Sequence, residues 1–174
     1  MVKINGFMVE IEASTIRGQQ QGMFIIGLPD QAIKEAGERI QAAIESCGYD
    51  IPKDKVIISL APGDKKKRGS HFDLGMIIAL LYQTDQIAPK NLNEYAFIGE
   101  LSLDGRIRPC TGVLSMITEA RKCGVSSVIV PYGNRQEKSM KNSTKRSSKP
   151  AAFFQNIPPE PHPKTFISLC VTAL

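Results

Sequence analysis

The sequence predicts an α/β fold, a sandwich in which helices pack on one main mixed sheet. Short runs of β-branched or alternating apolar residues recur along the chain, at residues 23–26, 55–60 and 126–130 among others. Between them lie longer stretches in which apolar residues return every three or four positions, the spacing of one face of a helix. Strands that alternate with helices in this way are joined by right-handed βαβ crossovers. The pattern therefore predicts parallel strand pairs covered by helices.

The first two strands are expected near the amino end. Residues 2–14 alternate roughly between apolar and polar side chains, with a bend at Gly6, and Met23 to Ile26 forms a second apolar run. The chain then turns into a helix at Pro29 and Asp30. Proline suits the first helical position because its missing N–H would be unpaired there, and an aspartate in the first turn opposes the helix dipole.

The longest helical pattern runs from Gln31 to Cys47, and Gly48 follows it as a residue suited to ending a helix. Its apolar side chains recur at three- and four-residue steps, which predicts one continuous amphipathic helix. The buried face is expected to hold Ile33, Ala36, Ile40, Ala43, Ile44 and Cys47, and the opposite face Lys34, Glu35, Glu38, Arg39 and Glu45.

The middle of the chain combines a strand, a basic loop and a buried helix. A β-branched run predicts a strand from Lys55 to Leu60, and the loop Lys65–Arg68 follows it. Ser70 and Asp73 have the spacing of a capping box, in which side-chain oxygens bond the free N–H groups of a helix start. The next stretch, Gly75 to Tyr82, is apolar on every side, which predicts a fully buried helix.

A second strand–helix–strand unit follows a surface connection. The segments Tyr95 to Leu101 and Gly105 to Arg108 flank an Asp-Gly pair, which favours a hairpin turn. Apolar residues from Val113 to Ala120 have helical spacing and predict another amphipathic helix. Ser126 to Val130 is then expected as a strand that ends this unit.

The character of the chain changes after Gln136. We therefore expect residues 1–136 to form the domain. Residues 137–163 are first polar and then rich in proline, a composition typical of disorder. Residues 164–174 become apolar again and are expected to dock as a terminal strand or helix.

Composition indicates a soluble globular protein. The 174 residues are 42% hydrophobic and 22% charged, and the longest apolar run, Met76 to Tyr82, is far shorter than the ~20 residues of a membrane span. The first residues lack the apolar core of a secretory signal. Four cysteines without CxxC spacing and two histidines argue against a zinc site or a disulfide framework. We expect no metal site, no membrane contact and a cytoplasmic location.

The net charge of +5 and the pI near 9.1 make a polyanion a plausible partner. Lys65, Lys66, Lys67 and Arg68 are the candidate nucleic-acid-binding residues, because adjacent cations can contact successive phosphates. The alternative is that this run is only a solvated loop. Both interpretations remain open at the level of the sequence.

Several separate motifs occur in one order along the chain: Ile25–Asp30 with Lys34-Glu35 and Glu38–Ile40, Leu60–Pro62, Phe72–Leu74, Gly99–Gly105, and Arg108-Pro109 with Gly112–Leu114. Together they resemble the N-terminal domain of the magnesium-chelatase-like AAA+ ATPases of the ComM/YifB type. The resemblance covers residues 2–136 almost continuously. It implies a Lon-protease-like fold, which is also that of the second domain of a small-subunit ribosomal protein.

The resemblance implies a longer protein with an AAA+ motor after this domain. ComM-type members are hexameric DNA helicases that promote branch migration during natural transformation. ATP and Mg²⁺ would belong to that motor, because Gly63 to Gly69 lacks the lysine of a phosphate-binding loop. We therefore expect no ATP hydrolysis by this chain and no cofactor in it. Two residues depart from the family pattern: Gly75 replaces a common proline, and Arg68 replaces a common acidic residue.

A divergent Lon-type serine peptidase is the enzymatic alternative. We call the two catalytic segments of Lon-type proteases, laid on this sequence in order, the Lon frame. It places Asp73 at the position of the serine nucleophile and Leu114 at the position of the lysine base. An amide bond needs an activated hydroxyl and a proton acceptor, and leucine accepts no proton. We expect Asp73 to cap its helix and no residue to be catalytic. The favoured hypothesis is a non-catalytic domain that supports assembly of the motor ring and guides DNA.

Overall fold

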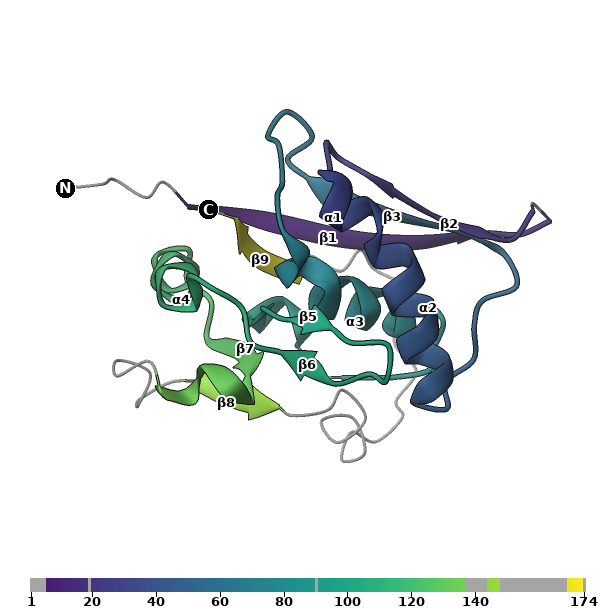
Figure 1. Ribbon diagram of the computed structural model, residues 1–174. Helices are drawn as coiled ribbons and strands as arrows, with labels where there is room; N and C mark the ends of the chain where they lie inside the picture. The colour runs from purple at the N-terminus through teal and green to yellow at the C-terminus, as the bar shows by residue number, and fades with distance from the viewer. Residues whose placement is uncertain (1–5, 19, 90, 137–143, 148–168, 174) are drawn as a thin grey trace.

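The computed structural model describes all residues except 1–5, 19, 90, 137–143, 148–168 and 174. Within the described residues a seven-stranded sheet has the order β2-β3-β1-β9-β4-β7-β8, and β5 and β6 form a separate hairpin (Figure 1). The elements are β1 (Phe7–Ile16), β2 (Gly22–Ile26), α1 (Gln31–Lys34), α2 (Ala36–Ser46), β3 (Lys55–Ala61), α3 (Asp73–Gln83), β4 (Tyr95–Phe97), β5 (Glu100–Leu101), β6 (Ile107–Arg108), α4 (Val113–Lys122), β7 (Ser127–Pro131), β8 (Thr144–Ser147) and β9 (Leu169–Ala173).

The sheet contains the parallel pairs that the strand–helix–strand pattern predicts. Strands β2 and β3 are parallel and are joined through α1 and α2, and β4 and β7 are parallel and are connected by a segment that contains α4. The long strand β1 is antiparallel to β3, with Ile11 opposite Leu60. The predicted α/β fold with a mixed sheet is therefore confirmed.

Helices cover both faces of the sheet. In β4 and β7, Phe97 and Ile129 join the core cluster that contains α3, whereas Ala96 and Val128 join the cluster around α4. Because neighbouring residues of a strand point to opposite faces, α3 and α4 lie on opposite sides of the sheet. Figure 1 shows α1, α2 and α3 grouped beside β1 to β3, with α4 set apart near the other half.

Helix α3 is the centre of the core. Residues Asp73 to Leu81 are all buried, as the apolar sequence of this helix predicts. Leucine and isoleucine side chains each contribute about 1.5–3 kcal/mol on full burial, so this helix stabilises the domain strongly. The predicted buried helix is confirmed, and so is the hairpin, formed by β5 and β6 around Asp104 and Gly105.

The single helix predicted from Gln31 to Cys47 is two helices. Helix α1 ends at Lys34 and α2 begins at Ala36, with Glu35 in the turn between them. Asp30 caps α1 by accepting from the Ile33 N–H at 3.0 Å. Gly37 follows the break, and because glycine is a weak helix former, interrupting the helix here costs little. Ile33 before the break and Ala36 after it are both buried.

The segment after residue 136 contributes strands to the main sheet. Strand β9 lies between β1 and β4, antiparallel to the first and parallel to the second, and β8 pairs in parallel with β7. The predicted boundary at residue 136 therefore does not divide the sheet, because β9 supplies the pairing partner that β1 and β4 share. The disorder predicted for residues 137–163 falls mostly outside the described residues, but β8 is a strand. Within residues 164–174, where a terminal strand or helix is predicted, the structure has a strand, β9.

No helix in the described part of the chain is both long and apolar enough to cross a membrane.

Candidate functional site

The start of α3, where the Lon frame puts its nucleophile, holds a buried ion pair. Asp73 is fully buried, and its Oδ2 accepts from the Arg39 Nε at 2.7 Å, while its Oδ1 accepts from the Arg39 Nη2 at 3.1 Å. Asp73 Oδ2 also accepts from the backbone N–H of Leu101 at 3.2 Å. The same guanidinium donates to the carbonyl of Ala32 at 2.8 Å. One carboxylate therefore ties α2, α3 and β5 together.

Burial and the ion pair act on the pKa of Asp73 in opposite directions. Burial raises the pKa of this carboxyl, because a charged group loses hydration in the interior, and the Arg39 guanidinium opposes that rise. The hydrogen bond to Asp73 in turn raises the pKa of Arg39. A carboxylate held by two guanidinium bonds and one amide has no hydroxyl to attack a peptide.

The capping role predicted for Ser70 and Asp73 is wrong. Ser70 begins a 3₁₀ turn, Ser70–Phe72, which lies before α3, and its hydroxyl donates to Glu100 Oε2. No side chain caps the first turn of α3. Instead the Leu74 N–H donates to the Gly99 carbonyl at 3.0 Å, and the Gly99 N–H donates to the His71 carbonyl at 2.9 Å. The backbone beside the helix has thus taken the place of the predicted box.

Glu100 connects this region to the hairpin and to the surface. Besides accepting from Ser70, it lies 3.4 Å from the Arg108 Nη1 across the hairpin, where Glu100 and Arg108 are cross-strand partners. In the same hairpin the Ser102 hydroxyl donates to the Asp104 carboxylate. Both serine hydroxyls therefore donate to carboxylates, and the Leu114 position of the Lon frame carries a partly exposed leucine on α4.

Cys110 lies close enough to Glu100 and Asp73 to feel their charges, and it is not activated. Burial raises its pKa to about 11, so the thiol stays protonated near neutral pH and is a poor nucleophile. Asn134 fixes the backbone of Cys110 on both sides, because its Oδ1 accepts from the Cys110 N–H at 3.1 Å and its Nδ2 donates to the Cys110 carbonyl at 2.7 Å. The local contacts of Cys110 are those of a structural residue.

The structure separates the four candidate nucleic-acid-binding residues. Lys67 is fully buried, and its Nζ donates to the carbonyls of Gly27, at 2.9 Å, and of Pro62. Burial lowers the pKa of Lys67, with Asp64 opposing that change. Lys67 therefore ties together the chain segments that follow β2 and β3, and its buried amine is not available to a phosphate.

The other three residues of the run are exposed on a loop that the backbone holds in place. The Lys67 N–H donates to the Leu28 carbonyl, and the Lys67 carbonyl accepts from the Asp30 N–H, both at 3.1 Å. Asp30 also accepts from the Gly69 N–H at 3.0 Å. On this fixed loop Lys65, Lys66 and Arg68 face solvent, and the Lys65 ammonium lies 4.7 Å from the centroid of the Phe7 ring.

In the described part of the chain, no three histidine, cysteine, aspartate or glutamate side chains are placed to hold a metal ion. His71 is buried and packs on Phe72, with their ring centroids 4.2 Å apart. His162 lies outside the described residues.

Arg39 and Lys67 are the residues whose roles the sequence did not indicate. Arg39 falls on the charged face of a helical pattern, and Lys67 falls in a run of four cations. Each resembles its exposed neighbours in sequence. Only the conjunction of Arg39 with a lone aspartate in an otherwise apolar helix could have indicated a buried pair, since a buried carboxylate requires a partner.

Comparison with known proteins gives one family and several relatives. The model of the family "Subunit ChlI of Mg-chelatase" matches residues 9–134. The uncharacterized protein YifB of Escherichia coli (strain K12) is 37% identical over 139 residues, which are 80% of this chain and 27% of the relative. Competence protein ComM of Haemophilus influenzae is 32% identical over 133 residues, 76% of this chain and 26% of the relative. A Lon protease of Trichlorobacter lovleyi is 27% identical over 141 residues, 77% of this chain and 17% of the relative.

The chain thus spans about a quarter of the length of YifB and ComM. The predicted resemblance to YifB and ComM is confirmed by these matches, and the more distant match to a Lon protease agrees with the predicted Lon-like fold.

Proposed function

The chain belongs to the family of subunit ChlI of Mg-chelatase, and on this premise we propose that it forms a non-catalytic N-terminal module of a longer ComM/YifB-type AAA+ ATPase. In this proposal the longer protein binds ATP and Mg²⁺ in a separate motor, assembles as a ring and acts on DNA. The module supports that assembly. The short share of each relative that the chain covers is consistent with a motor encoded elsewhere in the protein.

The observation that carries the proposal is the Asp73–Arg39 pair. At the position where a Lon-type peptidase needs a free hydroxyl, this chain has a fully buried carboxylate that binds a guanidinium and a backbone amide. All of these contacts join elements of the fold to one another. In this proposal the Lon-like domain serves as a structural scaffold, and its surfaces make the functional contacts.

A cytoplasmic location forms part of the proposal. Cys47, Cys110 and Cys123 are free thiols in the structure, which suits a reducing compartment.

Catalysis by the chain alone tests the proposal directly. We expect the 174-residue chain to hydrolyse no ATP in the presence of Mg²⁺, whereas the longer protein that contains it does. We also expect no cleavage of casein or of short fluorogenic peptides by the folded chain. ATP turnover or peptide cleavage that co-elutes with the chain through two purification steps would contradict a non-catalytic module.

A second candidate function is contact with DNA through Lys65, Lys66 and Arg68. The observation in its favour is that backbone hydrogen bonds fix the loop, so these exposed cations need little ordering on binding. Each phosphate contact adds to a salt-dependent affinity.

Titration of single- and double-stranded oligonucleotides at rising salt tests this candidate. Lys66→Glu should weaken binding and flatten the salt dependence, whereas Lys122→Glu, the same charge change on α4, should not. Equal effects of the two variants would assign the binding to net charge alone and remove the loop as a site.

A further inference from the structure

Strand β2 lies at one end of the main sheet and pairs only with β3 in the described order. Its residues, Gly22-Met23-Phe24-Ile25-Ile26, include no charge and no proline. Proteins usually protect such edges with charged side chains, prolines or bulges, because a free edge offers N–H and C=O groups to another strand. The edge of β2 lacks the first two of these protections.

The side chains of this strand also present an uncovered apolar face. Phe24 and Ile26 are each 51% exposed, and they point to the same face because they are two residues apart. Leu28, just beyond the strand, is 52% exposed. Helix α4 packs on this face beside β9, β1 and β7, whereas β2 stands at the end of the strand order.

The opposite face of β2 has a small apolar hollow beside the start of the strand. Met23 of β2, Ile44 of α2 and Val56 of β3 line it, with Ile51 from the loop before β3, and Gln21 and Gln41 stand at its margin. A strand added at the edge would point its side chains alternately toward Phe24 and Ile26 and toward this hollow. Both faces of an added strand would therefore meet apolar surface.

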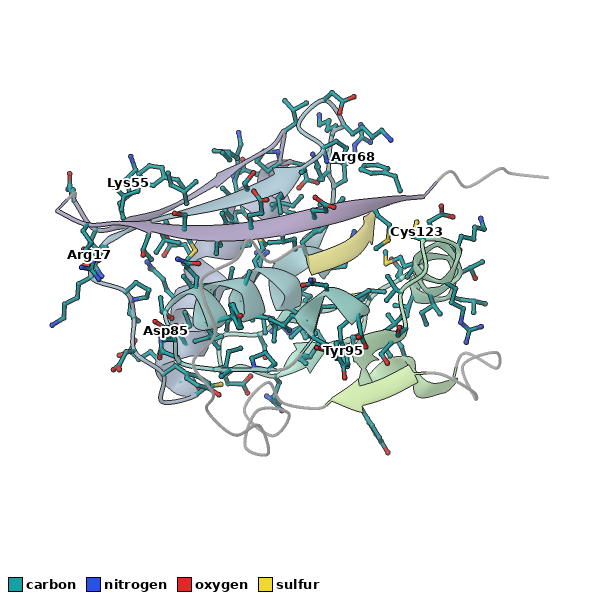
Figure 2. The ribbon with its side chains drawn as sticks, turned by 180° about the vertical axis from the view of Figure 1, so that it is seen from behind. Arg17, Lys55, Arg68, Asp85, Tyr95 and Cys123 are labelled. Atoms are coloured by element: carbon teal, nitrogen blue, oxygen red, sulfur yellow. The ribbon has the colours of Figure 1, made fainter. Side chains whose placement is uncertain are left out.

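Positive charge flanks both ends of β2. At its start, Lys55 is the register partner of Gly22, and its ammonium lies 4.9 Å from the centroid of the Phe24 ring. At its exit, the backbones of Lys67 and Pro29 form an isolated β-bridge, and the neighbours of Lys67, Lys66 and Arg68, are exposed. In Figure 2, Lys55 and Arg68 lie on the same side of β1, near opposite ends of the sheet's edge.

Two carboxylates, Asp30 and Asp64, lie close to the cations at the exit of β2. Asp30 accepts from the N–H groups of Ile33 and Gly69, and these bonds hold its carboxylate inside the turn. With Asp64 it offsets part of the local positive charge, but Lys65, Lys66 and Arg68 are all exposed, so cations remain in excess at this end. At the start of β2, Asp54 stands between Lys53 and Lys55 in sequence, which leaves an excess of positive charge there too.

We propose that the free edge of β2 binds an extended acidic segment of a protein partner, with apolar side chains at alternate positions, as an additional strand. Main-chain hydrogen bonds provide the affinity in this mode, and alternate side chains provide the selectivity. Acidic residues at the ends of the segment meet Lys55 at one end and Lys66 and Arg68 at the other. The proposal is independent of the motor and of any catalytic activity.

Charge argues against a second copy of this chain as the occupant. Two β2 strands that pair antiparallel about a two-fold axis bring the start of each strand beside the exit of the other. Lys55 of each copy would then approach Lys66 and Arg68 of its neighbour, and each copy carries a net charge of +5. Like charges placed together at an interface are strongly unfavourable.

The test measures fluorescence anisotropy of labelled peptides with the 174-residue chain. The probe DEVTVTVED carries alternate valines and acidic ends, and KRVTVTVRK is its charge-reversed control. We expect saturable binding of the acidic probe that weakens with salt, and binding of the control at least about tenfold weaker.

Two further measurements identify the edge itself. Phe24→Ser and Ile26→Ser should each weaken binding of the acidic probe several-fold, and circular dichroism should show an unchanged fold because both side chains are half exposed. Leu103→Ser, at an exposed apolar residue of the β5–β6 turn, is the matched control and should have no effect. Two probes N-methylated on complementary sets of alternate amides should differ, since only one set faces β2.

Several results would overturn the proposal. The acidic probe could show no saturable binding below about 1 mM. The acidic probe and its basic control could bind equally well, or the two N-methylated probes could bind equally well. Sedimentation of the chain as a dimer that Phe24→Ser dissociates would instead assign the edge to a second copy. The edge would be assigned to nucleic acid if an oligonucleotide bound more tightly than the acidic probe and if Phe24→Ser and Ile26→Ser weakened that binding.

Discussion

Asp73 acts through the residues that it connects. Its carboxylate receives two bonds from Arg39, 34 positions earlier, and one from Leu101, 28 positions later. Removing one partner of a buried pair leaves an uncompensated charge, whereas replacing both by apolar residues is often tolerated. The pair therefore contributes more to a specific arrangement of α2, α3 and β5 than to net stability.

Arg39→Met should destabilise the domain by about 3 kcal/mol, at the low end for a broken buried pair because Arg39 stays partly solvated. Urea denaturation monitored by circular dichroism measures this loss. Arg39→Met combined with Asp73→Leu should recover most of it. Lys122→Met, which removes an exposed i,i+3 pair, is the control and should cost less than about 1 kcal/mol. A double variant as unstable as Arg39→Met would contradict a charge-based role.

The same pair predicts a dependence on pH. Burial raises the pKa of Asp73 in the folded protein, and removing Arg39 takes away the group that opposes this rise. A carboxyl whose folded pKa is raised destabilises the fold as pH rises above its unfolded value, about 3.9, toward the folded value. The gap in unfolding free energy between the wild type and Arg39→Met should therefore be smaller at pH 4.5 than at pH 7. A constant gap would mean that Asp73 is not the group left unpaired.

Lys67 and its neighbours should differ in chemical reactivity. The Lys67 amine is fully buried on two carbonyls, whereas Lys65 and Lys66 are exposed. Acetylation with a water-soluble reagent, followed by mass spectrometry, should modify Lys66 rapidly and Lys67 only when urea unfolds the chain. Equal rates for the two lysines in the native protein would mean that the loop opens in solution.

At the scale of elements, the exit of β2 depends on a close approach of two backbones. Gly27 has a φ of +102°, and a Cβ at this position would overlap the Leu60 carbonyl of β3. The Gly27 carbonyl instead accepts from the Lys67 amine. A glycine is required here both for its conformation and for the space beside it.

Gly27→Ala should destabilise the domain by at least about 1–3 kcal/mol, because it adds strain at a positive φ and pushes β2 away from β3. Thermal unfolding measures the change. Gly63→Ala is the matched control in the neighbouring loop, where a Cβ meets nothing within 4 Å, and it should leave the midpoint almost unchanged. Similar midpoints for both variants would show that the β2–β3 contact is looser than the structure has it.

At the scale of the whole molecule, the C-terminal segment completes the sheet. Strand β9 pairs with β1 from Phe7 to Ile11 and links it to β4, so the halves of the sheet meet through it. Without β9, two inner strands would each have a free edge, which favours aggregation.

Deletion of residues 164–174 should therefore weaken the strands that pair with β9 more than the strands farther from it. We expect hydrogen exchange to show a loss of amide protection in β1 at Val9 and Ile11, with protection kept in β3 at Ile58, whose partners are β1 and β2. Unchanged protection at Val9 would contradict the position of β9 in the sheet.

The sequence by itself determined the fold class, nearly all of the elements and the buried state of α3. Those features rest on periodicity and turn residues, which act over a few neighbouring positions. The tertiary structure alone decided that Arg39 pairs with Asp73, that Lys67 is buried while Lys66 is exposed, and that β9 lies between β1 and β4. Each of these depends on the order of strands in the sheet, which brings together residues far apart in the chain, and local spacing carries no information about that order.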